Sequence, residues 1–373
     1  TKSTLNYTNN NGEDSTAIAT ELARAELVDM VPYQSARRLF ASDSDGSENA
    51  KTWLNANEAP GAGEYQLSAK NINRYPDFQP TSLLNAYSHY CGLAKEQILA
   101  TRGADEGIEL IIRTFCRAYR DNILICPPTY GMYAISAENH GAGVISVPLV
   151  SNRLDLNALA EQVGKAKVVF LCSPGNPTGN LLPREQIVSA IKLFSNTAMV
   201  VVDEAYIEFC PEQSTSDLLA EFNNVIILRT LSKAFALAGL RCGFTLASTE
   251  VITLLSKVIA PYPISAPVAE LASIALREDL SAMTTRVDLI NELRSRLSQW
   301  LNEQPWCIDV FQSDANFVLF RCQSTEEKDR IFNQLVEHDL LIRDQSKQTQ
   351  LENCLRISIG SEQEIAQLKT LLS

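Results

Sequence analysis

The sequence predicts a mostly parallel α/β sheet in a larger domain, followed by a smaller α+β domain. Short apolar runs rich in Val and Ile, without polar alternation, are typical of strands buried on both faces. Most of these runs are separated by enough residues for a crossover helix between parallel strands. After residue 267 the pattern changes, and long amphipathic helices dominate. The predicted strands of the larger domain are residues 123–126, 144–147, 168–172, 199–202, 225–228 and 244–247.

Length and composition describe a globular chain of two lobes. The 373 residues are long for one domain, and 45% of them are hydrophobic while 20% are charged. No run approaches the roughly 18 apolar residues of a membrane span, so we expect no membrane segment. The net charge of −12 disfavours nucleic acid and anionic membranes as partners. Nine cysteines without a CxxC pair and three isolated histidines predict a reducing cytoplasm and no metal site.

The N-terminal part of the chain contains two polar segments around a helical one. Residues 1–15 are rich in Asn, Thr and Ser, lack the apolar core of a secretory signal, and predict a disordered arm. Residues 18–39 have mixed helical periodicity, and the turn-rich residues 42–48 predict a loop at a boundary or an insertion. We therefore assign residues 1–66 to an N-terminal arm that also contributes to the smaller domain.

The remaining elements divide between the two domains. In the larger domain, residues 67–266, the spacing of Ile108, Ile111, Ile112 and Phe115 predicts a helix with a buried face. In the smaller domain, residues 267–373, helices are predicted over residues 281–303 and 325–338. Short strands are predicted over residues 316–320, 340–343 and 355–359. The pairs Ser324 with Glu327 and Ser361 with Glu364 have capping-box spacing and predict helix starts.

Lys233 is the residue on which the predicted chemistry depends. It lies among small and apolar residues in the stretch RTLSKAFALAGLR, and such surroundings lower the pKa of an amine and make it nucleophilic. Ser232 and Arg241 of the same stretch suit a phosphate monoester. A nucleophilic lysine beside a phosphate site indicates pyridoxal phosphate (PLP), an aldehyde that lysine holds as a Schiff base. A surface lysine on an ordinary helix is the alternative, so other parts of a PLP site are needed.

Four further motifs supply those parts. Asp203 ends an apolar strand, where a buried carboxylate would keep the pyridine nitrogen of PLP protonated, and Tyr206 could return a hydroxyl to the ring. Asn176, between two prolines, could donate its amide to the phenolate oxygen. The glycine-rich helix start at residues 103–107 suits a phosphate, and Tyr130 could stack on the pyridine ring. Taken alone, each motif also has a purely structural explanation. Asp203 could cap a strand end, Asn176 could belong to an Asn–Pro turn, residues 103–107 could be an ordinary helix start, and Tyr130 could be a core residue.

The chain order of these motifs resembles that of a known family. The matching stretches are YQSARRL at residues 33–39, LNANE at 54–58, NRYPD at 73–77, RGADEGIEL at 102–110, PPTYGMY at 127–133, DEAYIEFCP at 203–211, residues 230–244, and CLRISI at 354–359. From about residue 27 to the C-terminus, the chain resembles the class II aminotransferases of PLP fold type I. It is most similar to the branch that exchanges an amino group between glutamate and imidazole-acetol phosphate in histidine biosynthesis. The resemblance implies the fold-type I transferase architecture, PLP as cofactor, glutamate and histidinol phosphate as substrates, and a homodimer with shared active sites.

The resemblance also implies roles for individual cofactor residues. Lys233 would form the Schiff base, and Asp203 would be the partner of the pyridine nitrogen. Asn176 and Tyr206 would contact the phenolate oxygen, while Tyr130 would stack on the ring. The implied phosphate contacts are the backbone of Ala104 and Asp105, the side chains of Ser232 and Arg241, and Tyr75 from the other subunit.

The implied substrate-binding residues are Tyr33, Asn57, Asn176, Arg343 and Arg356. One departure from the family pattern is Gly175, where a second Asn is also common. Residues 1–20 and 42–48 lie outside the pattern.

Two alternatives stay open at this point. Another PLP enzyme of the same fold, such as threonine-phosphate decarboxylase or an aromatic aminotransferase, would share the cofactor site. A PLP-binding regulatory module fused to a DNA-binding domain belongs to a different functional class. The acidic net charge and the short, polar first 30 residues disfavour this second alternative.

Overall fold

The computed structural model describes residues 15–40 and 51–373, and the chain divides into two units. The first unit, Thr1–Gln34, contains the helices α1 (Ser15–Leu22) and α2 (Ala25–Val28). The second unit, Ser35–Ser373, begins with α3 (Ala36–Leu39) and holds all the strands described below. The loop predicted at residues 42–48 lies outside the described residues, as does the predicted arm up to residue 14.

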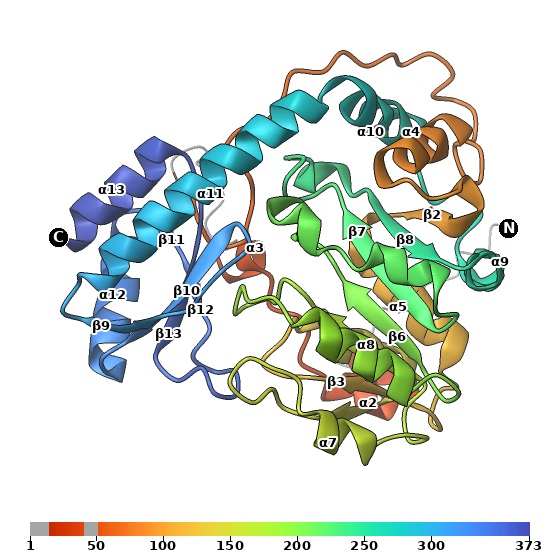
Figure 1. Ribbon diagram of the computed structural model, residues 1–373, viewed down its shortest axis with the longest axis horizontal. Coiled ribbons are helices and arrows are strands. Elements are labelled where there is room, and N and C mark those ends of the chain that lie inside the picture. The colour runs from red at the N-terminus through yellow and green to blue at the C-terminus, as the bar shows by residue number, and fades with distance from the viewer. Residues whose placement is uncertain (1–14, 41–50) are drawn as a thin grey trace, which may run out of the picture. The chain divides into compact units, whose positions relative to one another are not determined.

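Within residues 51–373, seven strands form the central sheet of the second unit (Figure 1), in the order β2-β8-β7-β6-β5-β3-β4. Its parallel strands include the neighbours β7, β6, β5, β3 and β4, whereas β8 runs antiparallel to both β7 and β2. The prediction of a mostly parallel sheet is therefore confirmed, although β2 was not predicted from the sequence. The strands are β2 (Ile98–Thr101), β3 (Asn122–Ile125), β4 (Gly143–Ser146), β5 (Val168–Cys172), β6 (Met199–Asp203), β7 (Val225–Thr230) and β8 (Gly243–Ala247).

Helices cover both faces of this sheet. One core cluster joins the sheet to α5 (Gly103–Phe115), α6 (Met132–His140) and α9 (Thr249–Val258). A second cluster joins the other face to α4 (Thr81–Cys91), α7 (Leu156–Ala160), α8 (Arg184–Leu193) and α10 (Ala266–Glu278). Along β5, Val168 and Phe170 belong to the first cluster, and Val169 and Leu171 belong to the second. Burial on both faces explains why these strands read as unbroken apolar runs.

The chain direction brings several strand ends to one edge of the sheet. β2, β3, β5, β6 and β7 all end there, because β8 reverses direction between β7 and β2. Thr101 and Thr230, the last residues of β2 and β7, both pair with Gly243, the first residue of β8. The start of α5 and the loop after β7 are thereby brought together. Ligands of open α/β sheets bind at such an edge.

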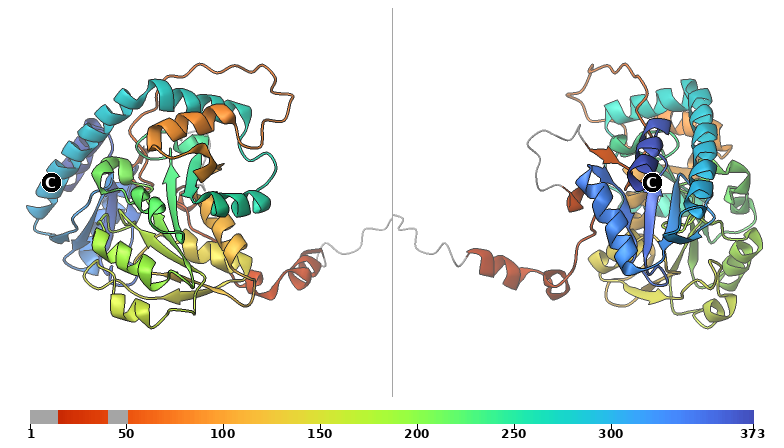
Figure 2. Two further views of the ribbon diagram at one scale, coloured as in Figure 1. Left: turned by 45° about the vertical axis from the view of Figure 1, so that its right-hand side comes forward. Right: turned by 90° about the vertical axis from the view of Figure 1, so that its left-hand side faces the viewer.

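Within the same described residues, a second sheet has four antiparallel strands in the order β12-β13-β10-β9. The long helix α11 runs from α10 to this sheet (Figures 1 and 2). The helix α12 packs against both β10 of the sheet and α13. Beside the sheet, β1 (Thr52–Trp53) pairs in parallel with β11 (Leu340–Leu341). The elements are β9 (Cys307–Val310), β10 (Phe317–Cys322), β12 (Arg343–Asp344), β13 (Cys354–Ser358), α11 (Leu280–Asn302), α12 (Thr325–Glu337) and α13 (Glu362–Leu372).

Local sequence signals mark the starts of two helices beside this second sheet. Ser324 accepts a hydrogen bond from the backbone of Glu327 at the start of α12, and Ser361 with Glu364 forms a complete capping box at the start of α13. The segment predicted as one strand over residues 340–343 divides into β11 and β12, and β9 was not predicted. The domain boundaries at residues 66 and 266 stay a prediction.

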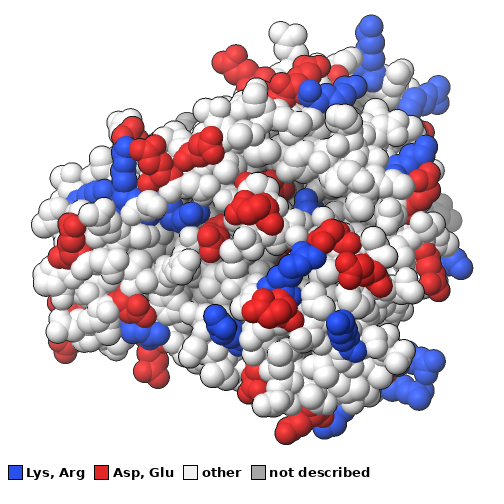
Figure 3. All heavy atoms as spheres, viewed as in Figure 1, with Lys and Arg blue, Asp and Glu red and all other residues white. Residues whose placement is uncertain are grey.

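The surface carries charges of both signs. On the face drawn in Figure 3, Lys and Arg side chains are interspersed with Asp and Glu. Of the helices within residues 15–40 and 51–373, none combines the length and the apolar character that crossing a membrane requires.

Candidate active site

Lys233 lies in the loop that follows β7, at the edge where the parallel strands end. Its Nζ donates a hydrogen bond of 2.9 Å to the carbonyl oxygen of Ala56, and lies 5.6 Å from the ring centroid of Tyr206. Burial, together with the nearby positive charge of Arg356, lowers the pKa of Lys233 to about 8. A substantial fraction of this amine is therefore neutral near physiological pH, as nucleophilic attack requires.

Asp203 is the last residue of β6 and is buried, with 3% of its surface exposed. Its Oδ2 accepts a hydrogen bond of 2.6 Å from the hydroxyl of Tyr133, and its Oδ1 accepts one of 3.1 Å from the backbone N–H of Ala205. Burial raises the pKa of Asp203 to about 6, although both hydrogen bonds favour the charged form. Among the described residues, no lysine or arginine forms an ion pair with this carboxylate. A cationic ligand group would thus find an uncompensated negative charge here.

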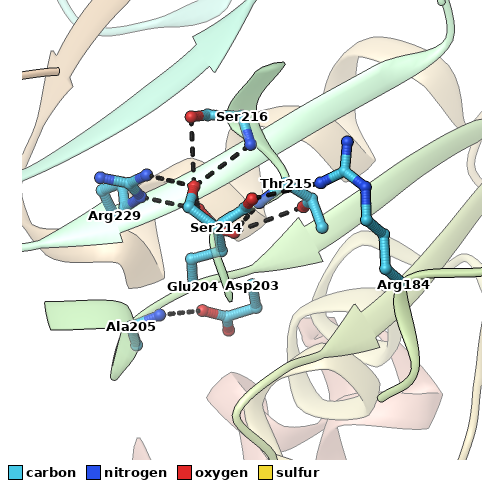
Figure 4. A network of polar contacts seen from close by, with 8 residues as sticks. All are labelled: Arg184, Asp203, Glu204, Ala205, Ser214, Thr215, Ser216 and Arg229. Carbon is cyan, nitrogen blue, oxygen red and sulfur yellow. Dashed lines mark hydrogen bonds and ion pairs between the residues drawn. The ribbon is translucent and has the colours of Figure 1, made fainter. Parts of the chain in front are cut away.

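Glu204, the next residue, makes a separate set of contacts (Figure 4). Its Oε1 accepts a hydrogen bond of 2.9 Å from Nε of Arg229 on β7, and its Oε2 accepts one of 2.7 Å from the backbone N–H of Thr215. Ser214 donates to Glu204 and accepts from Arg229. This ion pair is buried, and both carboxylate oxygens of Glu204 accept hydrogen bonds. Because Glu204 follows β6 and Arg229 lies on β7, the pair holds the ends of these two strands together. These two strand ends carry Asp203 and the Lys233 loop.

The start of α5 and the end of the Lys233 loop together form a cradle of hydrogen-bond donors. Gly103 has φ +73°, and a Cβ added to it would lie 2.6 Å from Nη2 of Arg241. The same guanidinium donates through Nη1 to Oγ of Ser232 at 3.3 Å, and Nη2 lies 3.4 Å from Oδ2 of Asp105. Glycine is needed at position 103 because a side chain would displace the guanidinium. Backbone N–H groups at the helix start, a serine hydroxyl and an arginine are the donors that a phosphate prefers.

Two tyrosines of the stretch PPTYGMY line this edge together. Tyr130 donates a hydrogen bond of 2.9 Å to Oδ1 of Asp105 at the cradle. Its ring lies edge-on to the ring of Tyr133, with centroids 5.6 Å apart and an interplanar angle of 90°. Tyr130 was predicted from the sequence as a site residue, whereas Tyr133 was missed. No local signal distinguishes Tyr133 from an ordinary core tyrosine before the position of Asp203 is known.

The segment of residues 54–58 brings the two sheets together at the site. Nδ2 of Asn57 donates 3.0 Å to the hydroxyl of Tyr206, while the backbone N–H of Asn57 donates 2.8 Å to Oγ of Ser358 on β13. Asn316 donates 2.9 Å to the carbonyl oxygen of Asn57. Asn57 has a left-handed backbone, with φ 56°, which asparagine tolerates better than most residues. None of these contacts was predicted from the sequence, which indicated only that Asn57 lies near the substrate.

Arg356 lies on β13 and is buried, with 6% of its surface exposed. It donates a hydrogen bond of 2.6 Å to Oδ1 of Asn176, in the loop after β5, and one of 3.0 Å to the carbonyl oxygen of Asn55. Arg343 on β12 pairs with Arg356 in the register of the smaller sheet, so both side chains lie on one face. The structure thereby joins the predicted residues Asn176 and Arg356, which are 180 positions apart.

Tyr75, predicted from the sequence as a cofactor residue, makes its ring contact elsewhere in the second unit. Tyr75 is 80% exposed, and its ring stacks on that of Tyr262 with centroids 4.3 Å apart. Its predicted contact is with a phosphate in the other subunit and stays a prediction. Tyr33 belongs to the unit of residues 1–34, and its role in substrate binding stays a prediction.

Comparisons with known proteins show the family to which the chain belongs. A family model described as aminotransferase class I and II matches residues 41–372. The histidinol-phosphate aminotransferase of Colwellia psychrerythraea is 70% identical over 94% of this chain and 98% of its own length. That of Pectobacterium atrosepticum is 50% identical over 92% of this chain and 94% of its own length. Among solved structures, the histidinol-phosphate aminotransferase from Sinorhizobium meliloti in complex with pyridoxal-5'-phosphate has a TM-score of 0.80. It is 25% identical, and the match covers 93% of this chain and 95% of that one.

Proposed function

This chain belongs to the aminotransferase class I and II family, and we propose that it acts as a histidinol-phosphate aminotransferase. The reaction is the reversible transfer of an amino group between glutamate and imidazole-acetol phosphate, which gives 2-oxoglutarate and histidinol phosphate. Relatives of that activity match more than nine tenths of the chain. The observation that carries the proposed chemistry is the convergence of Lys233, Asp203 and the Gly103–Arg241 cradle at one sheet edge. The small-molecule substrates follow from the same relatives.

The residues at this edge fit PLP. A glycine at position 103, where a Cβ would displace Arg241, leaves room for a phosphate beside Ser232 and the backbone of Ala104 and Asp105. Asp203 offers a buried carboxylate to the pyridine nitrogen. The donors and ring contacts that would hold the rest of the cofactor are Asn176, Tyr206 and Tyr130. When bound, PLP supplies an electron sink that makes the α-proton of an amino acid removable.

Lys233 and Asp203 hold the protons that this chemistry needs. With a pKa of about 8, Lys233 is partly neutral at physiological pH, so it can attach the cofactor and later accept and return a substrate proton. With a pKa of about 6, Asp203 is mostly ionised under the same conditions and can hold a proton on the pyridine nitrogen. The hydroxyl of Tyr206 is oriented by the hydrogen bond that it accepts from Asn57.

Arg356 accounts for the use of two different substrates at one site. Glutamate presents a carboxylate to the site, whereas imidazole-acetol phosphate and histidinol phosphate each present a phosphate. A planar guanidinium can bind either anion through two parallel hydrogen bonds. Arg343, adjacent to Arg356 in the smaller sheet, adds a second positive charge. Asn57 and Tyr33 complete the proposed substrate-binding set.

We further propose a cytoplasmic homodimer in which each subunit completes the site of the other. The stacked pair of Tyr75 and Tyr262 is exposed, by 80% and 49% respectively, and offers an aromatic surface to a second subunit. A tyrosine hydroxyl delivered from there would reach the partner's cofactor phosphate. All nine cysteines lie in the described residues and are free, which fits a reducing compartment.

A donor–acceptor experiment tests the proposed activity. Purified protein loaded with PLP is mixed with histidinol phosphate and 2-oxoglutarate, and the glutamate formed is measured. The Lys233→Ala variant is the control and should form none. Release of carbon dioxide from threonine phosphate, without glutamate formation, would replace the proposal with a decarboxylase. Turnover of aromatic amino acids at a higher kcat/KM than histidinol phosphate would replace it with an aromatic aminotransferase.

A further inference from the structure

Tyr133 has the geometry of a residue that holds another in place. It is fully buried on α6, and its ring stacks on that of Phe170 on β5 with centroids 4.6 Å apart and an interplanar angle of 11°. The ring of Tyr130 packs perpendicular to it. Its hydroxyl is thereby aimed at Asp203 and donates the 2.6 Å hydrogen bond to Oδ2. A short hydrogen bond of this kind to a carboxylate is among the stronger ones in proteins.

The two donors to Asp203 act on different oxygens. Tyr133 bonds Oδ2 and the backbone of Ala205 bonds Oδ1, so the plane of the carboxylate cannot rotate without the loss of one bond. We propose that Tyr133 is a positioning residue that orients the Asp203 carboxylate and keeps it ionised for the pyridine nitrogen of PLP. This inference rests on the proposed function, because it assumes that PLP binds at this edge.

The surroundings of Asp203 explain why such a donor matters. The titratable groups that act on its carboxylate come from four elements, namely Tyr133 on α6, Cys172 on β5, Asp105 on α5, and Glu204 and Tyr206 after β6. Asp105 and Glu204 are acidic and disfavour a further negative charge at Asp203, as burial also does. The thiol of Cys172 lies beside the same tyrosine hydroxyl, and burial raises its pKa, so it stays neutral. The donated hydrogen bond of Tyr133 is thus the main side-chain contact that favours the ionised form.

Tyr87 provides a matched control. It is buried, 1% exposed, and its ring stacks on Phe244 with centroids 3.6 Å apart. Its hydroxyl has no hydrogen-bond partner among the described residues, and it lies on α4 at the opposite face of the sheet. Tyr87→Phe therefore removes a buried hydroxyl without removing a donor to a carboxylate.

The test measures PLP binding as a function of pH. Equilibrium dialysis between pH 5 and 9 compares the full-length Lys233→Ala protein with the same protein carrying Tyr133→Phe or Tyr87→Phe. The Lys233→Ala background removes the covalent bond and the titration of the amine. The PLP phosphate also titrates near pH 6, but equally in all three proteins. Differences between the profiles therefore report on Asp203.

We call the Lys233→Ala protein the parent. We expect the affinity for PLP of the parent and of its Tyr87→Phe variant to fall as the pH is lowered through about 6, where Asp203 becomes protonated. In Tyr133→Phe the fall should begin about one pH unit higher, because loss of a hydrogen bond to the charged form raises the pKa of the acid. The affinity of Tyr133→Phe for PLP should then be roughly two- to sixfold weaker than that of Lys233→Ala alone between these two pH values, and the difference should approach tenfold below the lower one.

The outcomes separate two failures. If the unmodified protein with Lys233 binds no PLP at any pH, the proposed function fails. If the parent binds PLP and the Tyr133→Phe profile overlays that of Tyr87→Phe, the positioning role fails while the function stands. A second comparison adds Asp203→Asn to the parent and to Tyr133→Phe. The two should then have equal pH profiles, and a remaining shift would refute action through Asp203.

Discussion

Gly103→Ala isolates the contribution of the cradle at the start of α5. Residue 103 has φ +73°, and its new Cβ would lie 2.6 Å from Nη2 and 3.2 Å from Cζ of Arg241. Real Cβ atoms do not approach other heavy atoms so closely, so the guanidinium must move. Since it is the end of a flexible side chain, the movement itself costs little stability. It removes the arginine from the position where it would bind the phosphate.

The expected magnitudes follow from two separate effects. Placing alanine in the left-handed region costs about 1–2 kcal/mol of folding stability. Losing a charge-assisted hydrogen bond to the phosphate costs roughly 1.5–3 kcal/mol of binding free energy, which is about a 10- to 100-fold rise in the dissociation constant of PLP. The first effect is measured by urea unfolding and the second by equilibrium dialysis of PLP.

Gly92→Ala is the matched control, because Gly92 ends α4 with φ +76° and its new Cβ would have no described atom within 4 Å. Both variants should lose similar stability, and only Gly103→Ala should lose PLP affinity. Equal and native-like PLP affinity in both variants would refute the cradle as the phosphate site.

Three further predictions concern the proposed catalytic and substrate-binding residues. Lys233→Ala should abolish both turnover and the absorbance band of covalently held PLP, and an active Lys233→Ala protein would contradict the assignment. Arg356→Ala should raise KM for glutamate and for histidinol phosphate by roughly 10- to 100-fold through loss of a bidentate anion contact, and steady-state kinetics that show unchanged KM values would exclude that role. The rate at which apoprotein attaches PLP covalently should rise with pH and level off above about 8, because burial lowers the pKa of Lys233 and only its neutral amine attacks. A stopped-flow profile that levels off only near the ordinary lysine pKa would contradict this interpretation.

The sequence predicts those parts of the site that depend on short stretches of neighbouring residues. Asp203 and Lys233 both follow buried strands, and the carboxyl ends of parallel strands meet at one edge, so their proximity follows from the strand pattern alone. The glycine-rich start of α5 and the capping residues of α12 and α13 are likewise local signals. Such signals can be recognised without knowing which distant segment of the chain each residue contacts.

Contacts between distant segments could not be predicted in the same way. The hydrogen bonds between Asn57 and Ser358 span 301 positions, and no local pattern specifies that pairing. Neither β2 nor β9 was predicted: β2 pairs with the distant strand β8, and the pairing of β9 with β10 contains a register shift. Tyr133 was overlooked because its side chain reads as ordinary core until the position of Asp203 is known.

The reversal of β8 has a consequence for how this site can diverge. Because β8 returns beside β7, the chain leaves the sheet edge after Thr230 and re-enters it at Gly243 without crossing the molecule. One continuous loop therefore carries Lys233 and Arg241, which are proposed to attach the cofactor and to anchor its phosphate. Arg343 and Arg356 belong to a separate sheet, on strands encoded more than a hundred residues later. Lys233 and Arg241 are thus inherited together on one short segment, and selection can change Arg343 and Arg356 in the smaller sheet while leaving that segment unchanged.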